Sequence, residues 1–330
     1  MNLEGKQQIT TKELVRTLND AGYKHTLVEQ SSGDEQPMLA GELCFNKLPS
    51  GMRIHCTDIV EQKTGKTASE IDAGISINFL LAGSVDFALD NHQYHFSANS
   101  KPLIFINVLG QSQIFTRYFK QGMQLRKLNI SVSKRWLLSR CQNKTERIAI
   151  AQLFANKRAV FQWPCIEDTL VLVEQLFTYH NTNNIGSRLM SEQLAFQLFA
   201  NSYQLLMLSS KPNVTPRIQR CDLVGKEAAS YERKLNDLLY KSPSLAQIAS
   251  HLGASISTLQ RYFKAKHQVT INEYIRHQKL ERARRTLIFD KKSIGEVAYI
   301  AGYNHTSNFV TAFKKYFKIT PAELQKRHLS

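Results

Sequence analysis

Polar and basic side chains recur at helical spacing near the carboxyl end of the chain. Ser257, Gln260, Arg261 and Lys264 stand at i, i+3, i+4 and i+7, which places them on one face of a helix. Hydroxyl, amide and guanidinium groups are the side chains that hydrogen-bond to base edges in the major groove of DNA. The chemistry that this face could perform is therefore recognition of double-stranded DNA.

A second segment repeats this division into a polar and an apolar face. Ser307, Thr311 and Lys314 fall on one side of the expected helix, and Phe309 and Phe313 fall on the other. A single segment of this kind is as compatible with a surface helix that merely meets water as with a helix that reads DNA. Two copies in a basic part of the chain favour recognition.

The two segments belong to a unit that occurs twice, at residues 244–273 and 293–323. Gly253 and Gly302 occupy matching positions and can adopt the positive φ that a tight turn requires. Each copy opens on a capping box, which is Ser244 with Gln247 in the first and Ser293 with Glu296 in the second. The pattern predicts two helix-turn-helix units.

Residues 271–288 connect the two units and contain neither proline nor glycine. They predict one continuous helix of ~18 residues, about 27 Å long. Such a rod could hold two recognition helices roughly one DNA turn apart, about 34 Å. We expect Arg276 to contact a phosphate, whereas Glu281 and the helix surface could neutralise other basic residues. The other basic residues of this helix are Lys279, Arg282, Arg284 and Arg285.

Composition and charge support a nucleic-acid partner. The chain has 330 residues, which favours two domains, and 43 Lys and Arg against 27 Asp and Glu. From Asp222 onward, 19 basic residues stand against 9 acidic ones, as expected of a segment that meets a polyanion. The five cysteines lack any C-x-x-C pair, so they predict neither a disulfide framework nor a zinc site. Without a signal peptide or an apolar run long enough to span a membrane, the sequence predicts a cytoplasmic location.

The first two thirds of the chain predict a β-rich part followed by helices. Apolar residues alternate with a period of two between residues 39 and 132, which favours an antiparallel sandwich or a small barrel. Helical spacing follows over 133–208, where Leu194, Leu198 and Leu205 form a stripe that could pack on the β-rich part or mediate a dimer. Two prolines mark a linker. The predicted boundaries are 1–208 for the first domain, 209–221 for the linker and 222–330 for the second domain.

From about Cys221 to Arg327 the chain resembles the AraC/XylS family of bacterial transcription regulators, through both helix-turn-helix units, the linking helix and the closing "FKKYFKITPAE". The resemblance implies base contacts from Ser257, Gln260 and Arg261 in the first unit and from Thr306, Ser307, Asn308 and Thr311 in the second. Many members have Arg at the position of Thr311 and Gly at that of Lys318. The second unit is therefore expected to position the protein more than it specifies sequence.

The N-terminal region is similar to the effector domain of the same family, and residues 121–137 resemble the branch that responds to ferric siderophores. The resemblance implies an α+β chain, with a cupin-like β-barrel and dimerisation helices before the all-α DNA-binding domain. It also implies a small-molecule effector, with a ferric siderophore as the candidate, a homodimer, and RNA polymerase as a partner if the protein is an activator.

Three other kinds of protein are alternatives to a regulator. A metal-dependent barrel enzyme would need an H-x-H pair with a further carboxylate and His. His92 and His95 have the wrong spacing for this, so we expect no metal, no cofactor and no catalytic residue. A DNA-repair enzyme with this type of DNA-binding domain is a second alternative. The absence of a reactive-cysteine motif from this sequence argues against it. A third alternative is a nucleoid protein without sequence preference. In such a protein the polar faces of the two helices would make no base-specific contacts.

Overall fold

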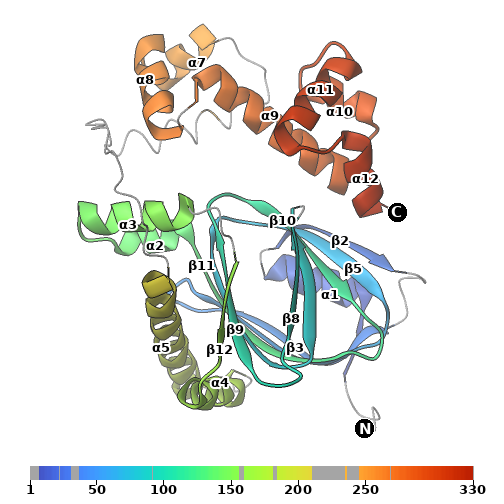
Figure 1. Cartoon of the computed structure of the whole chain (residues 1–330), viewed down its shortest axis with the longest axis vertical. Coiled ribbons are helices and arrows are strands. Elements are labelled where there is room, and N and C mark those ends of the chain that lie inside the picture. Colours follow the sequence, from blue (N-terminus) through green and yellow to red (C-terminus); the bar gives the residue numbers. More distant parts are fainter. Residues whose placement is uncertain are drawn as a thin grey trace. The chain divides into compact units, whose positions relative to one another are not determined.

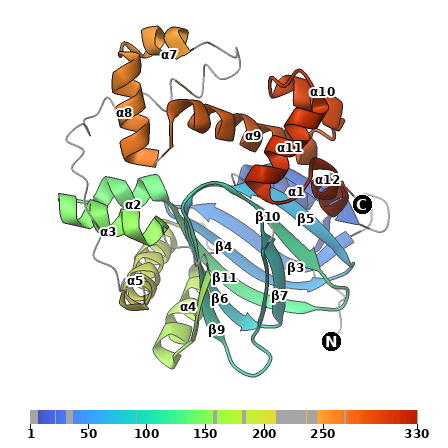
Figure 2. The same ribbon diagram turned by 45° about the horizontal axis from the view of Figure 1, so that its top comes forward.

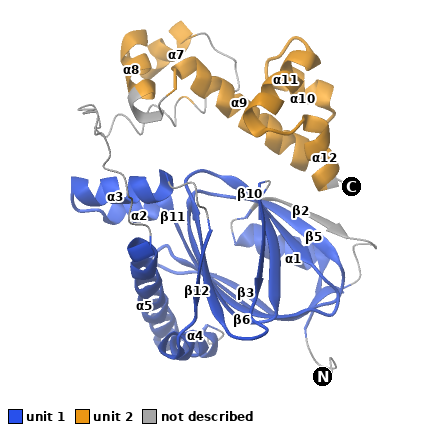
Figure 3. Ribbon diagram, viewed as in Figure 1, with its two compact units in different colours: residues 1–213 blue, residues 214–330 orange. Residues whose placement is uncertain are grey.

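The structure is a computed structural model that separates into two compact units, residues 1–213 and residues 214–330 (Figure 3). It describes residues 7–21, 23–30, 37–90, 92–155, 160–180, 184–209, 235, 245–267 and 269–329. Apart from Ser209, the linker predicted at 209–221 lies outside these residues, and so does Ser244, the first residue of a predicted capping box.

The first unit is built on two antiparallel sheets (Figure 1). The larger has the order β1 (Gln8–Thr10), β3 (Pro37–Lys47), β4 (Arg53–Glu61), β11 (Gln124–Ser133), β6 (Gly74–Ala82), β9 (Leu103–Leu109), β12 (Val160–Pro164). The smaller has the order β2 (Lys24–Gln30), β5 (Gly65–Ile71), β10 (Gln113–Phe119), β7 (Ser84–Leu89), β8 (His92–Ser97). The alternation of apolar residues between 39 and 132 thus correctly predicts a β-rich region.

In place of a closed barrel, the β-rich unit has two facing sheets. In the part of the chain that the structure describes, β12 pairs only with β9 and β8 pairs only with β7, so hydrogen bonding does not close a barrel. Phe87 and Phe96 of the smaller sheet pack in one core with Phe105 and Leu125 of the larger sheet. The architecture is a sandwich, the other arrangement that the sequence allows.

The segment 133–208 is not helical throughout, because β12 interrupts it. Val160 pairs with Asn107 of β9, and Phe161 pairs with Ile106. β-Branched and aromatic residues fit the half-buried surface of a sheet better than that of a short helix. Around this strand the chain forms α2 (Lys134–Arg140), α3 (Lys144–Ala155), α4 (Glu167–Tyr179) and α5 (Ile185–Ser209).

Helices α2–α5 cover the face of the larger sheet that points away from the smaller one (Figure 1). Phe79, Leu128 and Ile130 of the sheet share a core with Leu194 and Leu198 of α5. The opposite side of the larger sheet faces the smaller sheet, and α1 (Thr11–Asp20) adds Leu14 to that second core. The larger sheet is therefore buried on both faces, which places its polar side chains between layers of protein.

The second unit contains the two predicted helix-turn-helix pairs joined by a long helix (Figure 2). The first pair is α7 (Leu245–Leu252) and α8 (Ile256–His267), and the second is α10 (Ile294–Ile300) and α11 (Thr306–Phe317). The connection is α9 (Ile271–Phe289), and α12 (Pro321–Leu329) closes the chain. Gly253 and Gly302 have φ of 64° and 81° at the two turns, as predicted.

The repeat extends into the helix that follows each pair. Thr270 caps α9 and Thr320 caps α12, each accepting a hydrogen bond from the backbone N–H of a glutamate three residues later, Glu273 or Glu323. In return each glutamate accepts from the backbone N–H of its threonine, at 2.9 and 2.7 Å. These capping boxes fix the start of α9 relative to the first pair and the start of α12 relative to the second.

Candidate nucleic-acid interface

Helix α8 presents the polar face that the sequence predicts. Leu259 and Phe263 have 0% of their surface exposed, because they pack on α7 and on the start of α9. The residues of the predicted reading face are all exposed; they are Ser257, Gln260, Arg261 and Lys264. The buried face fixes the rotation of the helix, so these four side chains point away from the unit's own core.

The beginning of α8 is held by Ser255. Its Oγ accepts a hydrogen bond from the backbone N–H of Thr258 at 3.1 Å and lies 2.9 Å from Oγ of Ser257. Ser255 thus caps the helix and orients the hydroxyl group of Ser257. The sequence reasoning did not select Ser255, although a Ser directly before an apolar-periodic run is a cap signal.

Helix α11 is arranged in the same way. Phe309 and Phe313 are fully buried, and the predicted contact residues are all exposed; they are Thr306, Ser307, Asn308, Thr311 and Lys314. Oγ1 of Thr311 donates a hydrogen bond to the carbonyl oxygen of Ser307 at 2.9 Å. Because its proton is used inside the helix, Thr311 can offer a base only its methyl group and its oxygen lone pairs.

The basic residues of α9 divide into two kinds. Arg276 is exposed, as a phosphate contact must be. Arg284 has only 4% of its surface exposed; its Nη2 lies 2.8 Å from Oε2 of Glu281, and its guanidinium lies over the ring of Phe317. The expectation that Glu281 neutralises part of the basic helix therefore holds for Arg284, which stabilises the fold.

Two further contacts dock the second pair on α9. The ring of His277 stacks on Tyr316 of α11 with centroids 4.5 Å apart. Burial and the neighbouring Arg276 lower the pKa of His277 against the opposing effect of Glu273, so the ring stacks as a neutral group near pH 7. The Nε2 of Gln325 in α12 donates to the carbonyl oxygen of Leu287 in α9 at 3.5 Å and to that of Lys292, which follows α9, at 2.8 Å. The linking helix is thereby part of the core of the second pair.

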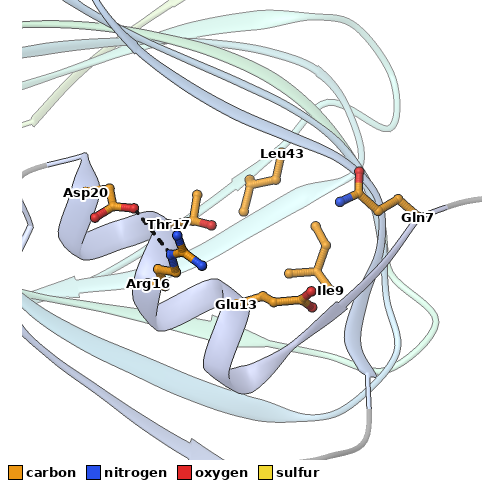
Figure 4. Close-up of a pocket in the computed structure, with 7 residues that line it drawn as sticks. All are labelled: Gln7, Ile9, Glu13, Arg16, Thr17, Asp20 and Leu43. Atoms are coloured by element: carbon orange, nitrogen blue, oxygen red, sulfur yellow. Dashed lines mark ion pairs between the residues drawn. The ribbon is translucent and has the colours of Figure 1, made fainter.

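Two surface pockets lie among the described residues of the N-terminal unit. One, of about 260 Å³, lies beside α1, with Ile9 and Leu43 as its apolar walls (Figure 4). Its polar lining includes Arg16 and Asp20, which form an exposed ion pair at 3.9 Å. The other, of about 380 Å³, is lined by residues of β7, β8 and β10, among them Tyr94, His95 and Tyr118. A pocket of this size can admit a small molecule.

The space between the two sheets holds charged groups. Arg117 donates from Nη2 to Oε1 of the buried Glu61 at 2.6 Å. Lys127 of β11 lies near both, and burial is the main cause that lowers its pKa to about 7, with Arg117 adding to the effect and Glu61 opposing it. Burial, and then Lys127, hold the pKa of His55 well below its usual range. The sequence analysis assigns no role to these residues.

The histidines considered as metal ligands lie apart. His92 and His95 are exposed on β8, and Nδ1 of His95 lies 2.6 Å from Oδ1 of Asp86. His55 stacks on Phe45 with ring centroids 3.8 Å apart. Among the described residues, no three His, Cys, Asp or Glu side chains gather as a metal site. None of the helices described is both long enough and apolar enough to cross a membrane.

Comparison with known proteins identifies both units. A helix-turn-helix domain model matches residues 248–327, and the model of the "Regulatory protein PchR N-terminal domain" matches residues 40–218. The first match spans α8, α9 and α11, and therefore every predicted DNA-contact residue. The second covers more than half of the chain and ends beyond α5.

Curated relatives agree with these matches. An HTH-type transcriptional regulator of Pseudoalteromonas carrageenovora is 37% identical over 117 residues, which is 36% of this chain and 68% of that protein. The xylose operon regulatory protein of Haemophilus influenzae is 36% identical over 81 residues, 24% of this chain and 21% of that protein. The activator RhaS of Enterobacter sp. is 25% identical over 50% of this chain and 57% of its own length. The chain thus spans only part of these relatives.

Solved structures include that of ToxT from Vibrio cholerae, whose match covers 92% of this chain and 98% of its own, with a TM-score of 0.38 and 14% identity. The assignment depends on the two domain models and the Pseudoalteromonas relative. The chain belongs to the AraC/XylS family of DNA-binding transcription regulators, and its N-terminal unit is of the PchR regulatory-protein type.

Proposed function

We propose that this regulator reads two adjacent major grooves of one DNA duplex with α8 and α11. Base contacts come from Ser257, Gln260 and Arg261 on α8, and on α11 from Thr306, Ser307, Asn308 and Thr311. Phosphates are bound by Lys264, Arg276 and Lys314. The observation that carries this proposal is that two matching helices each bury a Leu or Phe stripe and expose a polar one, with a single 19-residue helix between them.

The two units differ in what they can read. Arg261 can donate two hydrogen bonds to a guanine and Gln260 can pair with an adenine. On α11 the readers have short side chains, and the proton of Thr311 is already donated to Ser307. We therefore assign most of the sequence discrimination to α8, while α11 holds the protein in register.

For the N-terminal unit we propose a small-molecule effector that changes how the protein binds or activates at its operators. A ferric siderophore is the proposed effector, supported by the resemblance of residues 121–137 to the siderophore-responsive branch and by the match to the PchR-type domain. The targets would then be genes of iron acquisition. The protein would act by binding in the cytoplasm, without catalysis, and would contact RNA polymerase if it activates.

A homodimer through α4 and α5 is also proposed, on a surface that includes only Leu205 of the stripe that the sequence indicates. Leu194 and Leu198 are buried in the chain's own core, because α5 uses that stripe to cover the larger sheet. Leu205, the third residue of the predicted stripe, is exposed, and so are other apolar residues of the two helices; they are Val171, Ile185, Leu189 and Leu208. Exposed residues of this kind favour burial in a subunit interface.

Genomic footprinting with and without iron limitation tests the function as a whole. The proposal requires protected sites near iron-acquisition genes, each covering two neighbouring major grooves, and a response to iron limitation. Protection without sequence preference would contradict recognition by α8. Sites that do not respond to iron would contradict the siderophore and leave DNA recognition standing.

A further inference from the structure

Lys127 places an amino group inside the N-terminal sandwich. It lies in register with Thr57 of β4 and Leu80 of β6, on the side of the larger sheet that faces the smaller one. Its neighbours on that side include His55, which is hydrogen-bonded to Thr57 at 2.9 Å. Within the described residues, the amino group of Lys127 makes no hydrogen bond and no ion pair.

The charges around Lys127 do not compensate it. The carboxylate of Glu61 already accepts from Nη2 of Arg117 at 2.6 Å and from the backbone N–H of Lys120 at 2.5 Å. The other nitrogen of Arg117, Nη1, donates to the carbonyl oxygen of Asp86. His55 is neutral near pH 7 because burial and Lys127 lower its pKa. The carboxylate of Glu61 attracts Lys127 from a distance, but within the described residues no carboxylate is in direct contact with its amino group.

Side chains around Lys127 are partly accessible, unlike the aromatic core between the sheets. Phe87, Phe96 and Phe105 stack on each other with centroids 4.4–6.0 Å apart and are at most 9% exposed. By contrast, Phe45 and His55 keep part of their surface accessible, as does Lys127, although burial shifts the pKa of both His55 and Lys127. Side chains that are surrounded by protein and still accessible border space that a small molecule can enter.

We propose that the effector carries an anionic oxygen, a carboxylate or a phenolate, which pairs with the ammonium group of Lys127 between the two sheets. The apolar part of the effector lies along the stacked rings of Phe45 and His55. This inference rests on the proposed function only in assuming that the N-terminal unit binds a small molecule. An anion supplies the missing partner, and its charge attracts the ammonium strongly where water is scarce.

The cost of keeping Lys127 unpaired supports a role in binding. A lysine at the centre of a sheet that is covered on both faces destabilises the fold unless a partner is present, and an apolar residue would fill the position more stably. Retention of a destabilising group in an interior is typical of functional sites. The bound effector would then stabilise the unit through its contacts and also by giving the ammonium group of Lys127 a partner.

Thermal unfolding of the full chain with simple probes tests the proposal. Benzoate and salicylate supply the anion, and benzamide and salicylamide are neutral analogues of nearly the same shape. We expect both acids, at millimolar concentration, to raise the melting temperature of the wild type by several degrees more than the amides do. No advantage of the acids over the amides would overturn the proposal.

Variants of Lys127 test whether this residue causes the stronger stabilisation by the acids. Lys127→Met should abolish the advantage of the acids, Lys127→Arg should keep it, and Lys101→Met, which alters an exposed lysine, should leave it unchanged. Without probe, Lys127→Met should melt no lower than the wild type, because the unpaired charge is gone. Lys127→Gln serves as a second neutral variant if the methionine variant does not fold. An undiminished response in a folded neutral variant would overturn the proposal.

Iron complexes extend the test to larger probes. The iron(III) tris-catecholate complex is anionic and the iron(III) tris-acetohydroxamate complex is neutral, so binding of the first should weaken at least tenfold in Lys127→Met and binding of the second should not change. Equal weakening of both would contradict a charge interaction. Neither the unfolding assay nor the iron-complex assay contains DNA, so a negative result in them does not contradict DNA recognition by α8 and α11. Conversely, a missing operator footprint would not contradict the role of Lys127.

Discussion

The guanidinium of Arg284 in α9 lies 5.1 Å from the ring centroid of Phe317 at the end of α11. This contact connects the linking helix directly to the second recognition helix. The start of α9 is equally fixed to the first pair, because Ile271 is fully buried in the core around Phe263. The two recognition helices are thus attached to one rigid element at its opposite ends.

Arg261→Ala should cost about 1–3 kcal/mol of specific DNA binding and relax base choice at one position, because the bidentate donor to a guanine is lost. Competition binding with a library of operator variants measures both effects. Lys264→Ala, on the same face, is the control and should weaken binding to all sequences alike. Equal losses on specific and random DNA for Arg261→Ala would contradict its assignment as a base reader.

Arg284→Met should destabilise the second unit by on the order of 3 kcal/mol, because it removes the ion pair with Glu281 in a mostly buried site. Thermal unfolding detects this loss. Arg276→Met is the matched control on the same helix: it should leave stability unchanged and reduce the slope of log affinity against log salt concentration by about 1. The reverse pattern would mean that Arg284 binds phosphate and Arg276 does not.

Lys318→Gly should stabilise the second unit by about 0.5–1 kcal/mol, because Lys318 ends α11 in the left-handed region at φ 64°, where glycine has no strain. The loss of the hydrogen bond from its Nζ to the carbonyl of Lys315 offsets part of this gain. Gly253→Ala is the converse case: φ is also 64° and the new Cβ would contact nothing, so strain alone should destabilise it by about 1 kcal/mol. Chemical denaturation measures both, and a destabilised Lys318→Gly would refute the strain argument.

Stability should rise with pH between about 7 and 10.5 through Lys127. Its pKa is about 7 in the folded protein against 10.5 in an unfolded chain, so over that window the unfolded chain binds more protons and raising the pH favours folding. The advantage of Lys127→Met over the wild type should be largest below pH 7 and shrink by on the order of 3 kcal/mol toward pH 10. Urea titrations at several pH values provide the comparison. A difference that does not vary with pH would show that Lys127 titrates normally.

The sequence predicts the second unit well because the repeated pattern indicates both where its helices lie and which face of each helix is buried. Gly253 and Gly302, the capping residues and the Phe pairs are local signals, and each has a local physical cause. Arg284 is predictable only in part: Glu281, three positions earlier, is a local candidate for its ion pair, but its other partner, Phe317, lies 33 positions away.

The first unit is less predictable because burial there depends on layers that are distant in sequence. Alternation along residues 128–132 correctly indicates one buried face of β11, and it suggests that Lys127 and Asn129 face solvent. The second sheet covers that side as well, so Asn129 is 6% exposed and Lys127 lies inside. The sequence leaves two partners open for the stripe of Leu194 and Leu198, and the structure shows that these residues pack on the chain's own sheet.

Insertion of base pairs between the two half-sites of an operator tests the central claim most directly. We predict that adding either a half turn or a full turn of DNA lowers affinity to that of a single helix-turn-helix unit, since the rigid α9 cannot reach the displaced groove. Retained affinity after a full-turn insertion would show that the connection is flexible, and affinity that ignores every insertion would show that only one of the two helices reads DNA.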